Sequence, residues 1–315
     1  MIETRGLRRV FKSRARVVEA VAGVDLTVEP GEIFGFLGPN GAGKTTTLRM
    51  LTTLMPPSGG TARVAGYDLL MQSADIRNRI GYVGQAGGAD REITGRRELV
   101  FQGRLYGMSS AAARQRAAEL ILMLELEVCA DRAGSTYSGG QKRRLDIGLG
   151  LVHNPQLLFL DEPTTGLDPQ SRARVWDEVR RMHERGTTVF LTTHYLDEAD
   201  ALCDRIAIID YGKIVAEGTP ESLKRAVAGD VVTMSVAGDQ KQALDLLKDQ
   251  DFVRESRLEE GSVLLYVDRG EVAMPAILRL LDGAGMQLTT IGLHRPSLDD
   301  VFLRQTGRSL REPAA

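Results

Sequence analysis

Cysteine is scarce in this sequence, which holds only Cys129 and Cys203, far apart and without a CxxC motif or a nearby histidine cluster. This scarcity argues against a disulfide framework and a zinc site, and it fits a reducing compartment. Long apolar runs are also missing, because none reaches the roughly 18–20 residues that a membrane helix needs. The first twelve residues, MIETRGLRRVFK, contain no signal-peptide core. We therefore expect neither a membrane span nor a signal peptide in this chain.

The sequence also lacks a large excess of positively or negatively charged residues. Lys and Arg number 40 and Asp and Glu 42, giving a formal net charge of −2. This balance argues against a nucleic-acid binder that relies on a broad basic surface, although it leaves room for a local basic patch. With 315 residues and 43% apolar content, the chain is long enough for two domains with a sizeable core.

Short apolar runs alternate with helical segments over the first two thirds of the chain. Residues 2–34 are rich in strand-forming patterns. Further predicted strands are 33–37, 157–160, 187–192 and 205–210, and predicted helices are 46–54, 98–125, 172–185 and 197–201. This alternation predicts an α/β core with a mainly parallel sheet.

The composition changes near Gly218-Thr219-Pro220, where we expect a boundary between domains 1–220 and 221–315. The second part has the order strand 230–236, helix 240–249, strands 253–258 and 263–267, helix 274–281 and strand 287–293. This βαββαβ order predicts a small ferredoxin-like α+β domain. Ser297 then begins a last predicted helix.

A glycine-rich loop lies between a predicted strand and a predicted helix, and it fits the pattern G-x-x-x-x-G-K-[ST]. The glycines allow backbone N–H groups to close around phosphate oxygens, and the helix adds the positive end of its dipole. Lys44 supplies a charge for the outer phosphates, and the Thr45 hydroxyl can bind Mg²⁺. The predicted ATP-binding residues of this loop are Gly38, Pro39, Asn40, Gly41, Ala42, Gly43, Lys44, Thr45 and Thr46.

The run Leu157–Leu160 predicts a buried strand that ends at Asp161 and Glu162. Ligand sites in open α/β sheets gather at the carboxyl ends of the strands. Asp161 can hold Mg²⁺, and Glu162 can orient or deprotonate an attacking water. Alone this run is weak evidence, but together with the glycine-rich loop it indicates a nucleoside triphosphatase.

Residues 137–145, YSGGQKRRL, resemble the signature of the ABC family, usually written LSGGQ, with Tyr137 in place of leucine. Taken alone, a Ser-capped helix after a glycine turn is a fair alternative interpretation. The resemblance implies that Ser138, Gly139, Gly140 and Gln141 of one subunit close on the nucleotide that its partner holds. It thus implies a homodimer of nucleotide-binding domains, with ATP and Mg²⁺ as ligands.

Four further positions match the family in order. Gln85 resembles the Q-loop glutamine that senses Mg²⁺, Asp168 the D-loop residue at the dimer seam, and His194 the switch histidine that contacts the γ-phosphate. Phe11 stands where the family places an aromatic ring against adenine. Each position also has a purely structural interpretation. Gln85 can be an exposed loop amide and Asp168 part of a turn. His194 can be a packed or surface side chain, and Phe11 can be a core residue.

The family resemblance implies an ABC-type P-loop fold, with a mainly parallel sheet core, an antiparallel β subdomain and a helical subdomain at about 86–150. It assigns catalysis to Glu162, His194, Lys44 and Gln85, and the metal to Thr45, Gln85 and Asp161. No group of the second domain suggests catalysis. That domain is expected to regulate or stabilise a dimer, and a passive packing role stays open.

Shorter segments narrow the resemblance to the daunorubicin/doxorubicin-resistance branch of exporter ATPases. They are Thr94-Gly95-Arg96, residues 103–107 (GRLYG), residues 295–303 (RPSLDDVFL) and Thr306-Gly307-Arg308. This branch implies an ATPase that energises efflux of a drug, antibiotic or other hydrophobic compound. A separate polytopic permease would form the channel, and the chain would sit on it at the cytoplasmic face of the membrane.

Two alternatives compete with an exporter. One is a non-transport ABC ATPase that acts on nucleic acid or the ribosome, but Ser138 follows Lys44 by only 94 residues with no sustained heptads, and one ATPase unit is present. We therefore expect no nucleic-acid partner. The other is a nucleotide-binding switch without transport. The sequence does not indicate the cargo, because the ATPase of such a machine does not touch it.

Overall fold

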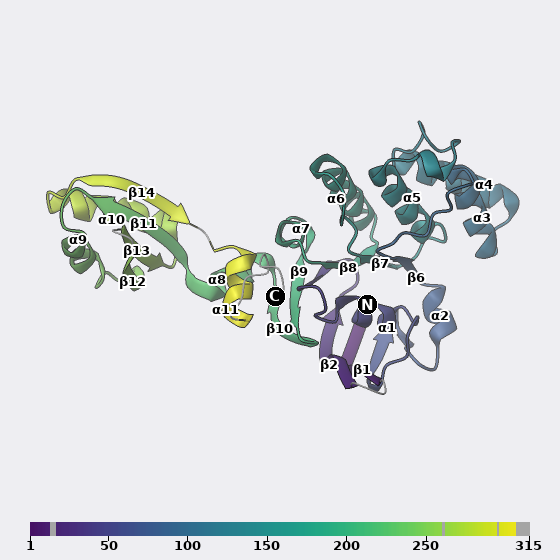
Figure 1. Ribbon diagram of the computed structural model, residues 1–315, viewed down its shortest axis with the longest axis horizontal. Helices are drawn as coiled ribbons and strands as arrows, with labels where there is room; N and C mark the ends of the chain where they lie inside the picture. The colour runs from purple at the N-terminus through teal and green to yellow at the C-terminus, as the bar shows by residue number, and fades with distance from the viewer. Residues whose placement is uncertain (13–16, 260–261, 295, 307–315) are drawn as a thin grey trace. The chain divides into compact units, whose positions relative to one another are not determined.

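The computed structural model describes residues 1–12, 17–259, 262–294 and 296–306. The chain divides into two compact units, Met1–Glu217 and Gly218–Ala315, drawn in Figure 1. Arg295, Gly307 and Arg308, which belong to the exporter-like tail segments, lie outside the described residues.

A six-stranded sheet forms the centre of the first unit, in the order β10-β9-β3-β8-β7-β6. Its strands are β3 (Ile33–Leu37), β6 (Ile80–Val83), β7 (Leu157–Asp161), β8 (Thr188–Thr193), β9 (Arg205–Asp210) and β10 (Lys213–Gly218). The pairs β3/β8, β3/β9, β6/β7 and β7/β8 are parallel. Every residue of β3, β7 and β8 is buried, which explains the apolar runs 157–160 of β7 and 189–191 of β8. The mainly parallel α/β core is confirmed.

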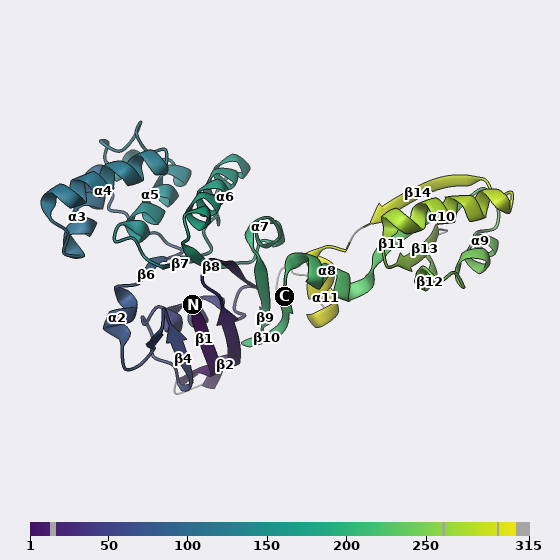
Figure 2. The ribbon, with the colours of Figure 1, turned by 180° about the vertical axis from the view of Figure 1, so that it is seen from behind.

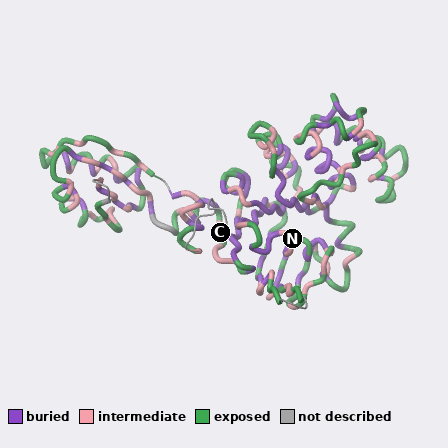
Figure 3. Tube along the Cα trace, in the orientation of Figure 1, coloured by how far each residue is buried: buried purple, intermediate pink, exposed green. Residues whose placement is uncertain are grey.

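An antiparallel sheet of order β2-β1-β4-β5 completes the core. It consists of β1 (Ile2–Lys12), β2 (Val17–Val28), β4 (Gly59–Val64) and β5 (Tyr67–Asp68). Helix α1 (Lys44–Leu51) contributes Leu48, Met50 and Leu51 to one buried cluster with strands of both sheets. Figure 3 shows this buried material along the central strands. Helix α1 starts two residues earlier and ends three residues earlier than predicted.

The remaining helices of this unit are α2 (Ser73–Arg77), α3 (Gly95–Leu105), α4 (Ser110–Met123), α5 (Gly139–Leu151), α6 (Pro169–Glu184) and α7 (Leu196–Leu202). Figures 1 and 2 show α3–α5 gathered at one end of the unit and the antiparallel sheet at the other. The helical pattern predicted for about 98–125 is confirmed; it is divided between two helices, α3 and α4, with residues 106–109 between them. Gly107 has a φ of 81°, and the Ser109 side chain caps α4.

The second unit contains α8 (Pro220–Ala228), β11 (Asp230–Val236), α9 (Gln240–Leu247), β12 (Val253–Glu259), β13 (Ser262–Val267), α10 (Gly270–Gly283), β14 (Leu288–His294) and α11 (Leu298–Thr306). Its sheet has the order β12-β13-β11-β14 with antiparallel neighbours. The predicted βαββαβ order is confirmed. Helix α10 begins four residues before the predicted start, and Pro275 lies inside it rather than in its first turn.

Within the described part of the chain, no helix combines the length and the apolar character required to cross a membrane.

Candidate active site

The glycine-rich loop connects β3 to α1 and is shaped by close backbone contacts. Gly43 is the N-cap of α1 with a φ of 106°, and a Cβ there would lie 2.4 Å from the carbonyl oxygen of Ala20. A Cβ on Gly38 would lie 2.3 Å from the carbonyl oxygen of Ile209. Both positions therefore require glycine. The N–H groups of the first α1 turn have no partner within the helix, which makes this loop a candidate anion site.

The carboxylate of Glu162, directly after β7, is the meeting point of the predicted catalytic residues. Lys44 Nζ lies 3.3 Å from Glu162 Oε1. Gln85 Nε2 donates a hydrogen bond of 3.1 Å to Glu162 Oε2, and His194 Nδ1 lies 3.3 Å from the same oxygen. Segments far apart in the sequence thus converge on one buried carboxylate, whose exposed fraction is 7%.

The backbone of Glu162 is held in an unusual conformation. Its φ is 46°, in the left-handed region that side-chain-bearing residues rarely adopt. Its N–H group donates to both the carbonyl oxygen and the hydroxyl of Thr192, each at 3.1 Å. Strained residues of this kind persist only where their surroundings fix them, and they cluster at functional sites.

The charges of this cluster stabilise one another. Burial would raise the pKa of Glu162, but the contact with His194 and the charge of Lys44 outweigh it and lower this pKa to about 2. Burial lowers the pKa of Lys44, and the neighbouring carboxylates of Glu162 and Asp161 oppose that effect. We conclude that Glu162 is ionised at neutral pH and can accept a proton from water only when its surroundings change.

Oxygen atoms suited to Mg²⁺ lie beside this carboxylate. The hydroxyls of Thr45 and Thr192 donate to Asp161 Oδ1 at 3.1 Å and 2.6 Å. Among the described residues, no group of three or more His, Cys, Asp and Glu side chains could hold a metal. Mg²⁺ is commonly bound through one or two carboxylates plus substrate phosphates, so a hydroxyl and a carboxylate beside a phosphate-binding loop fit it.

The signature segment forms the start of α5. Ser138 is its N-cap, and Ser138 and Gln141 satisfy each other's backbone N–H groups in a capping box. A Cβ on Gly140 would lie 2.8 Å from the Ser171 hydroxyl, so this turn packs on the start of α6. There Asp168 caps α6 by accepting from the Ser171 N–H at 2.9 Å.

The two predicted phosphate-binding segments are separate within one chain. No hydrogen bond or ion pair of the described residues joins 138–141 to 38–46.

Phe11 lies near the end of β1 and is 38% exposed, so it is not a core residue. It pairs with Val18, two residues from the Ala20 that contacts the glycine-rich loop. Its ring is partly open to solvent.

Comparisons with known proteins agree with this geometry. The family model "ABC transporter" matches residues 21–165, and the model "ATP-binding protein DrrA1-3-like, C-terminal domain" matches residues 218–306. The chain is similar to the daunorubicin/doxorubicin resistance ATP-binding protein DrrA of Streptomyces peucetius, with 47% identity over 97% of this chain and 92% of that protein.

The chain belongs to the ATP-binding proteins of ABC transporters.

Two further similarities support this placement. The linearmycin resistance ATP-binding protein LnrL of Bacillus subtilis is 34% identical over 99% of this chain and all of that protein. A dimeric ATP-binding cassette, solved in a post-hydrolysis state with ADP and phosphate, matches with a TM-score of 0.64 and 26% identity. That match covers 70% of this chain and 98% of the other. The chain is an ATPase of this family, and no comparison supports the nucleic-acid alternative.

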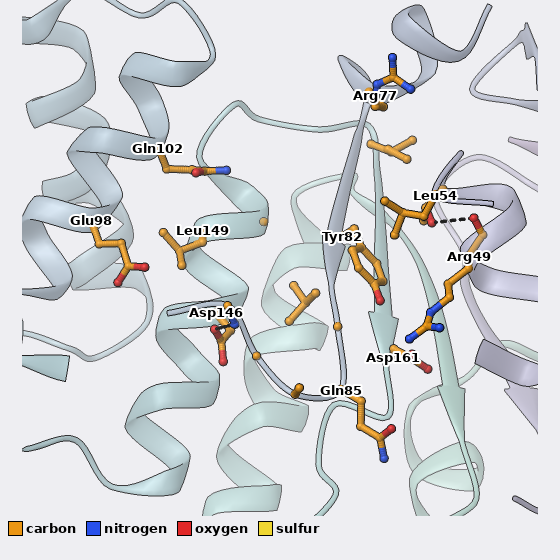
Figure 4. A pocket seen from close by; sticks show the side chains of 18 of the residues that line it. Arg49, Leu54, Arg77, Tyr82, Gln85, Glu98, Gln102, Asp146, Leu149 and Asp161 are labelled. Atoms are coloured by element: carbon orange, nitrogen blue, oxygen red, sulfur yellow. Dashed lines mark hydrogen bonds between the residues drawn. The ribbon is translucent and has the colours of Figure 1, made fainter. Parts of the chain in front are cut away.

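In this ABC ATPase, a cleft of about 610 Å³ lies next to Gln85. Figure 4 shows Glu98 and Gln102 on the helical side of the cleft and Tyr82 on the opposite side. One oxygen of the buried Glu98 carboxylate, Oε2, has no hydrogen-bond partner. Burial raises the pKa of Glu98. This face therefore offers an acidic group in a partly apolar recess.

Sequence reasoning missed two side chains that shape the ATPase site. Thr192 bonds Asp161 and the Glu162 backbone, and only its position at the end of a strand next to β7 could have indicated this. Arg143 is buried beside the same backbone, with an exposed fraction of 7%. Its place on the signature helix gave no signal of what it contacts.

Proposed function

We propose that this ABC ATPase energises the efflux of a drug, antibiotic or other hydrophobic compound through a separate membrane permease. The convergence of Lys44, Gln85 and His194 on Glu162 supports ATP hydrolysis at this site. The names of the relatives refer to resistance against daunorubicin, doxorubicin and linearmycin, which supports export. Nod factor export ATP-binding proteins are 40% and 41% identical to this chain, and they extend the range of compounds that the names of the relatives mention.

In the proposed reaction, the phosphates of ATP lie on residues 38–46 and adenine stacks on Phe11. Lys44 then leaves the carboxylate of Glu162 for the outer phosphates, which frees Glu162 to orient the attacking water. His194 contacts the γ-phosphate from the other side. Catalysis is mainly positioning and charge stabilisation, as for phosphoryl transfer in general. Mg²⁺, held by Thr45, Asp161 and Gln85, would neutralise charge on the phosphates.

The functional unit is proposed to be a homodimer. Among the residues that the structure describes, no hydrogen bond or ion pair joins the helix start at Ser138, Gly139 and Gly140 to the phosphate loop of the same chain. This helix start would therefore be available to the nucleotide of a partner. Asp168 would lie at the seam, because it caps the helix on which the signature turn packs. The dimeric form of the similar cassette supports this arrangement.

The permease is proposed to dock in the cleft beside Gln85, with the chain bound to the cytoplasmic face of the membrane. Gln85 bonds Glu162 and lies two residues after the cleft-lining strand β6. A displacement of the cleft would therefore reach the hydrolytic carboxylate through a single side chain.

Trapping an ATP-bound dimer tests the hydrolytic and dimeric parts of this proposal. Glu162→Gln keeps the shape of the side chain but cannot take a proton, so we expect ATP binding to persist and turnover to fall by about a hundredfold or more. The trapped protein should sediment as a dimer with ATP and as a monomer with ADP. Glu119→Gln, on the exposed face of α4, is the control. Wild-type turnover, or a monomer even with the membrane partner present, would contradict the proposal.

Transport is tested in inverted membrane vesicles that contain the chain and the permease that copurifies with it. Doxorubicin is fluorescent, so its ATP-driven accumulation can be followed directly. We expect accumulation with the wild type and none with Lys44→Ala. Copurification with ribosomes or DNA instead of a polytopic membrane protein would favour the non-transport alternative.

A further inference from the structure

Arg143 occupies an unusual position on the signature helix. Although it is charged, it is 7% exposed, and its guanidinium donates three hydrogen bonds to backbone carbonyl oxygens. Nε bonds Pro163 at 2.7 Å, Nη1 bonds Gly84 at 2.7 Å, and Nη2 bonds Asp161 at 3.0 Å. Charge-assisted bonds from a planar fork are strong and directional, so this side chain holds three backbone points in fixed positions.

Each of these carbonyl groups adjoins a residue of the proposed catalytic cluster. Asp161 and Pro163 stand immediately before and after Glu162, and Gly84 stands immediately before Gln85. A single guanidinium thus fixes the backbone on both sides of the carboxylate and ahead of the amide that bonds it.

The hydrogen bonds of Arg143 lie next to the strained backbone of Glu162. Its φ of 46° costs about 1–2 kcal/mol for a residue with a side chain, so neighbouring contacts have to maintain it. Thr192 accepts from the N–H group of Glu162, and the Thr165 N–H group donates to the carbonyl oxygen of Glu162 at 3.3 Å. Arg143 bonds the carbonyl groups of Asp161 and Pro163, which restricts the peptide directly before Glu162 and the peptide directly after Pro163.

The same helix holds the other end of the Gln85 loop. Asp146 lies one helical turn after Arg143, and its Oδ1 accepts from the N–H groups of Gly88 at 2.7 Å and Ala89 at 2.9 Å. Burial lowers the pKa of Arg143, and the carboxylates of Asp146 and Asp161 oppose this effect. Arg143 stays charged at neutral pH, because guanidinium groups are not deprotonated in proteins.

We propose that Arg143 is a positioning residue for ATP hydrolysis, which holds Glu162 and Gln85 in register from the signature helix. It touches neither ATP nor the attacking water, and it acts only through the backbone. Ser138 caps α5, the helix that carries Arg143. One buried side chain thus joins the segment proposed to grip the partner's nucleotide to the backbone beside the hydrolytic carboxylate of its own chain. This inference rests on the proposed function of Glu162.

The next residue of the helix provides a matched control. Arg144 is 6% exposed and also donates to backbone carbonyl groups, those of Leu124 at 2.7 Å and Glu125 at 3.1 Å. Neither acceptor adjoins a residue of the catalytic cluster. A loss caused merely by removing a buried arginine from α5 would therefore appear in Arg144→Met as well as in Arg143→Met.

The first test measures MgATP hydrolysis and ATP binding by the full-length protein. For Arg143→Met we expect kcat to fall by about a hundredfold, as a displacement near 1 Å can cause, with the Kd for ATP nearly unchanged. Arg144→Met should keep kcat close to the wild-type value. Equal losses of kcat in the two variants, or an unchanged kcat in Arg143→Met, would overturn the inference.

A double-mutant cycle with Glu162→Gln separates positioning from general damage. If Arg143 acts through the carboxylate of Glu162, Arg143→Met should lower the residual turnover of Glu162→Gln only slightly. If Arg143→Met lowers the turnover of Glu162→Gln by the same factor as it lowers that of the wild type, the positioning role is refuted. If Glu162→Gln hydrolyses ATP at the wild-type rate, the proposed function fails. If Glu162→Gln is slow but Arg143→Met has the wild-type kcat, only the present inference fails.

Arg143→Lys keeps the test valid should the methionine variant not fold. Lysine preserves the charge but lacks the fork that reaches three carbonyl groups, so we expect a kcat between those of the wild type and Arg143→Met. Thermal unfolding identifies the folded variants. If folded Arg143→Lys has the kcat of the wild type, the result counts against the inference. This holds whether Arg143→Met also has a wild-type kcat or fails to fold.

Discussion

Lys44 Nζ lies 3.3 Å from Glu162 Oε1, and the two side chains are only 4% and 6% exposed. Lys44 also donates to the carbonyl oxygens of Gly38 at 2.7 Å and Pro39 at 3.1 Å. The ammonium group is therefore attached both to the loop that would hold phosphates and to the carboxylate that would activate water. Each buried charge depends on its partner, because either one alone would bear an uncompensated desolvation cost.

Lys44→Ala should have two separable effects. It removes the charge directed at the phosphates, so the Kd for ATP should rise by about tenfold or more in a titration with labelled ATP. It also leaves the Glu162 carboxylate buried without its cation, so the nucleotide-free protein should lose about 3–5 kcal/mol of stability in urea unfolding.

The double variant Lys44→Ala with Glu162→Gln is the control for that stability effect. Because the remaining side chain is neutral, most of the lost stability should return, whereas weak ATP binding should persist. A double variant as unstable as Lys44→Ala would contradict the ion-pair explanation.

Gly43→Ala and Gly41→Ala form a matched pair within the phosphate loop. Both residues have positive φ, at 106° and 82°, so alanine is strained by about 1 kcal/mol at each. Only Gly43 would place its Cβ against backbone, 2.4 Å from the Ala20 oxygen, and nothing lies within 4 Å of the corresponding Cβ on Gly41. We expect Gly43→Ala to lose ATP binding and several degrees of melting temperature, and Gly41→Ala to lose much less. Equal effects would mean that this close approach is unimportant.

The adenine contact proposed for Phe11 can be tested with two ligands, ATP and inorganic triphosphate, and two variants. Stacking on an aromatic ring contributes about 1–3 kcal/mol for a base, so Phe11→Ala should raise the Kd for ATP by about fivefold or more. Phe11→Tyr preserves the ring and should bind normally. Inorganic triphosphate has no base, and its affinity should not change in either variant. Unchanged ATP binding by Phe11→Ala would remove Phe11 from the site.

Glu178 on α6 predicts a pH dependence of stability. It is 1% exposed, and burial raises its pKa from 4.5 to about 7, although Arg181 opposes the shift at 3.2 Å. Other charges around it are Glu125, Arg144 and Asp177. In the folded protein this carboxyl keeps its proton above pH 4.5, where the unfolded chain has lost it. Stability should therefore fall as pH rises from about 4.5 to 7, by at most about 3 kcal/mol, and level off above that.

Glu178→Gln should abolish that slope, since it cannot ionise. Urea unfolding at pH 5, 6, 7 and 8 measures it, with Glu119→Gln as an exposed control on α4. We expect the variant and the wild type to be similar at pH 5 and the variant to be more stable at pH 8. A wild-type curve as flat as that of Glu178→Gln would show that the buried carboxyl does not titrate in this range.

Local patterns in the sequence predicted much of this protein. The loop 38–45, the strand ending at Asp161 and the Ser138 turn are contiguous segments whose glycines, caps and apolar runs determine their own conformation. The strands 205–210 and 230–236 were predicted with their observed bounds, because their pattern is short and uninterrupted. The bounds of α3 and α4 were predicted less closely, because the helical pattern was given only as about 98–125, whereas Gly107 and the Ser109 cap separate two helices there.

The sequence by itself determined that this chain has a phosphate-binding loop, an acidic strand end and an ABC signature, because each is encoded by neighbouring residues. Only the tertiary structure decided what surrounds Glu162: Lys44, Gln85 and His194 meet there because parallel strands bring distant chain segments to one sheet edge. It also decided that Arg143 and Arg144 are buried against carbonyl groups while Arg174 and Arg180 are exposed. Burial and long-range contact depend on the packed fold, and no local pattern of residues specifies them.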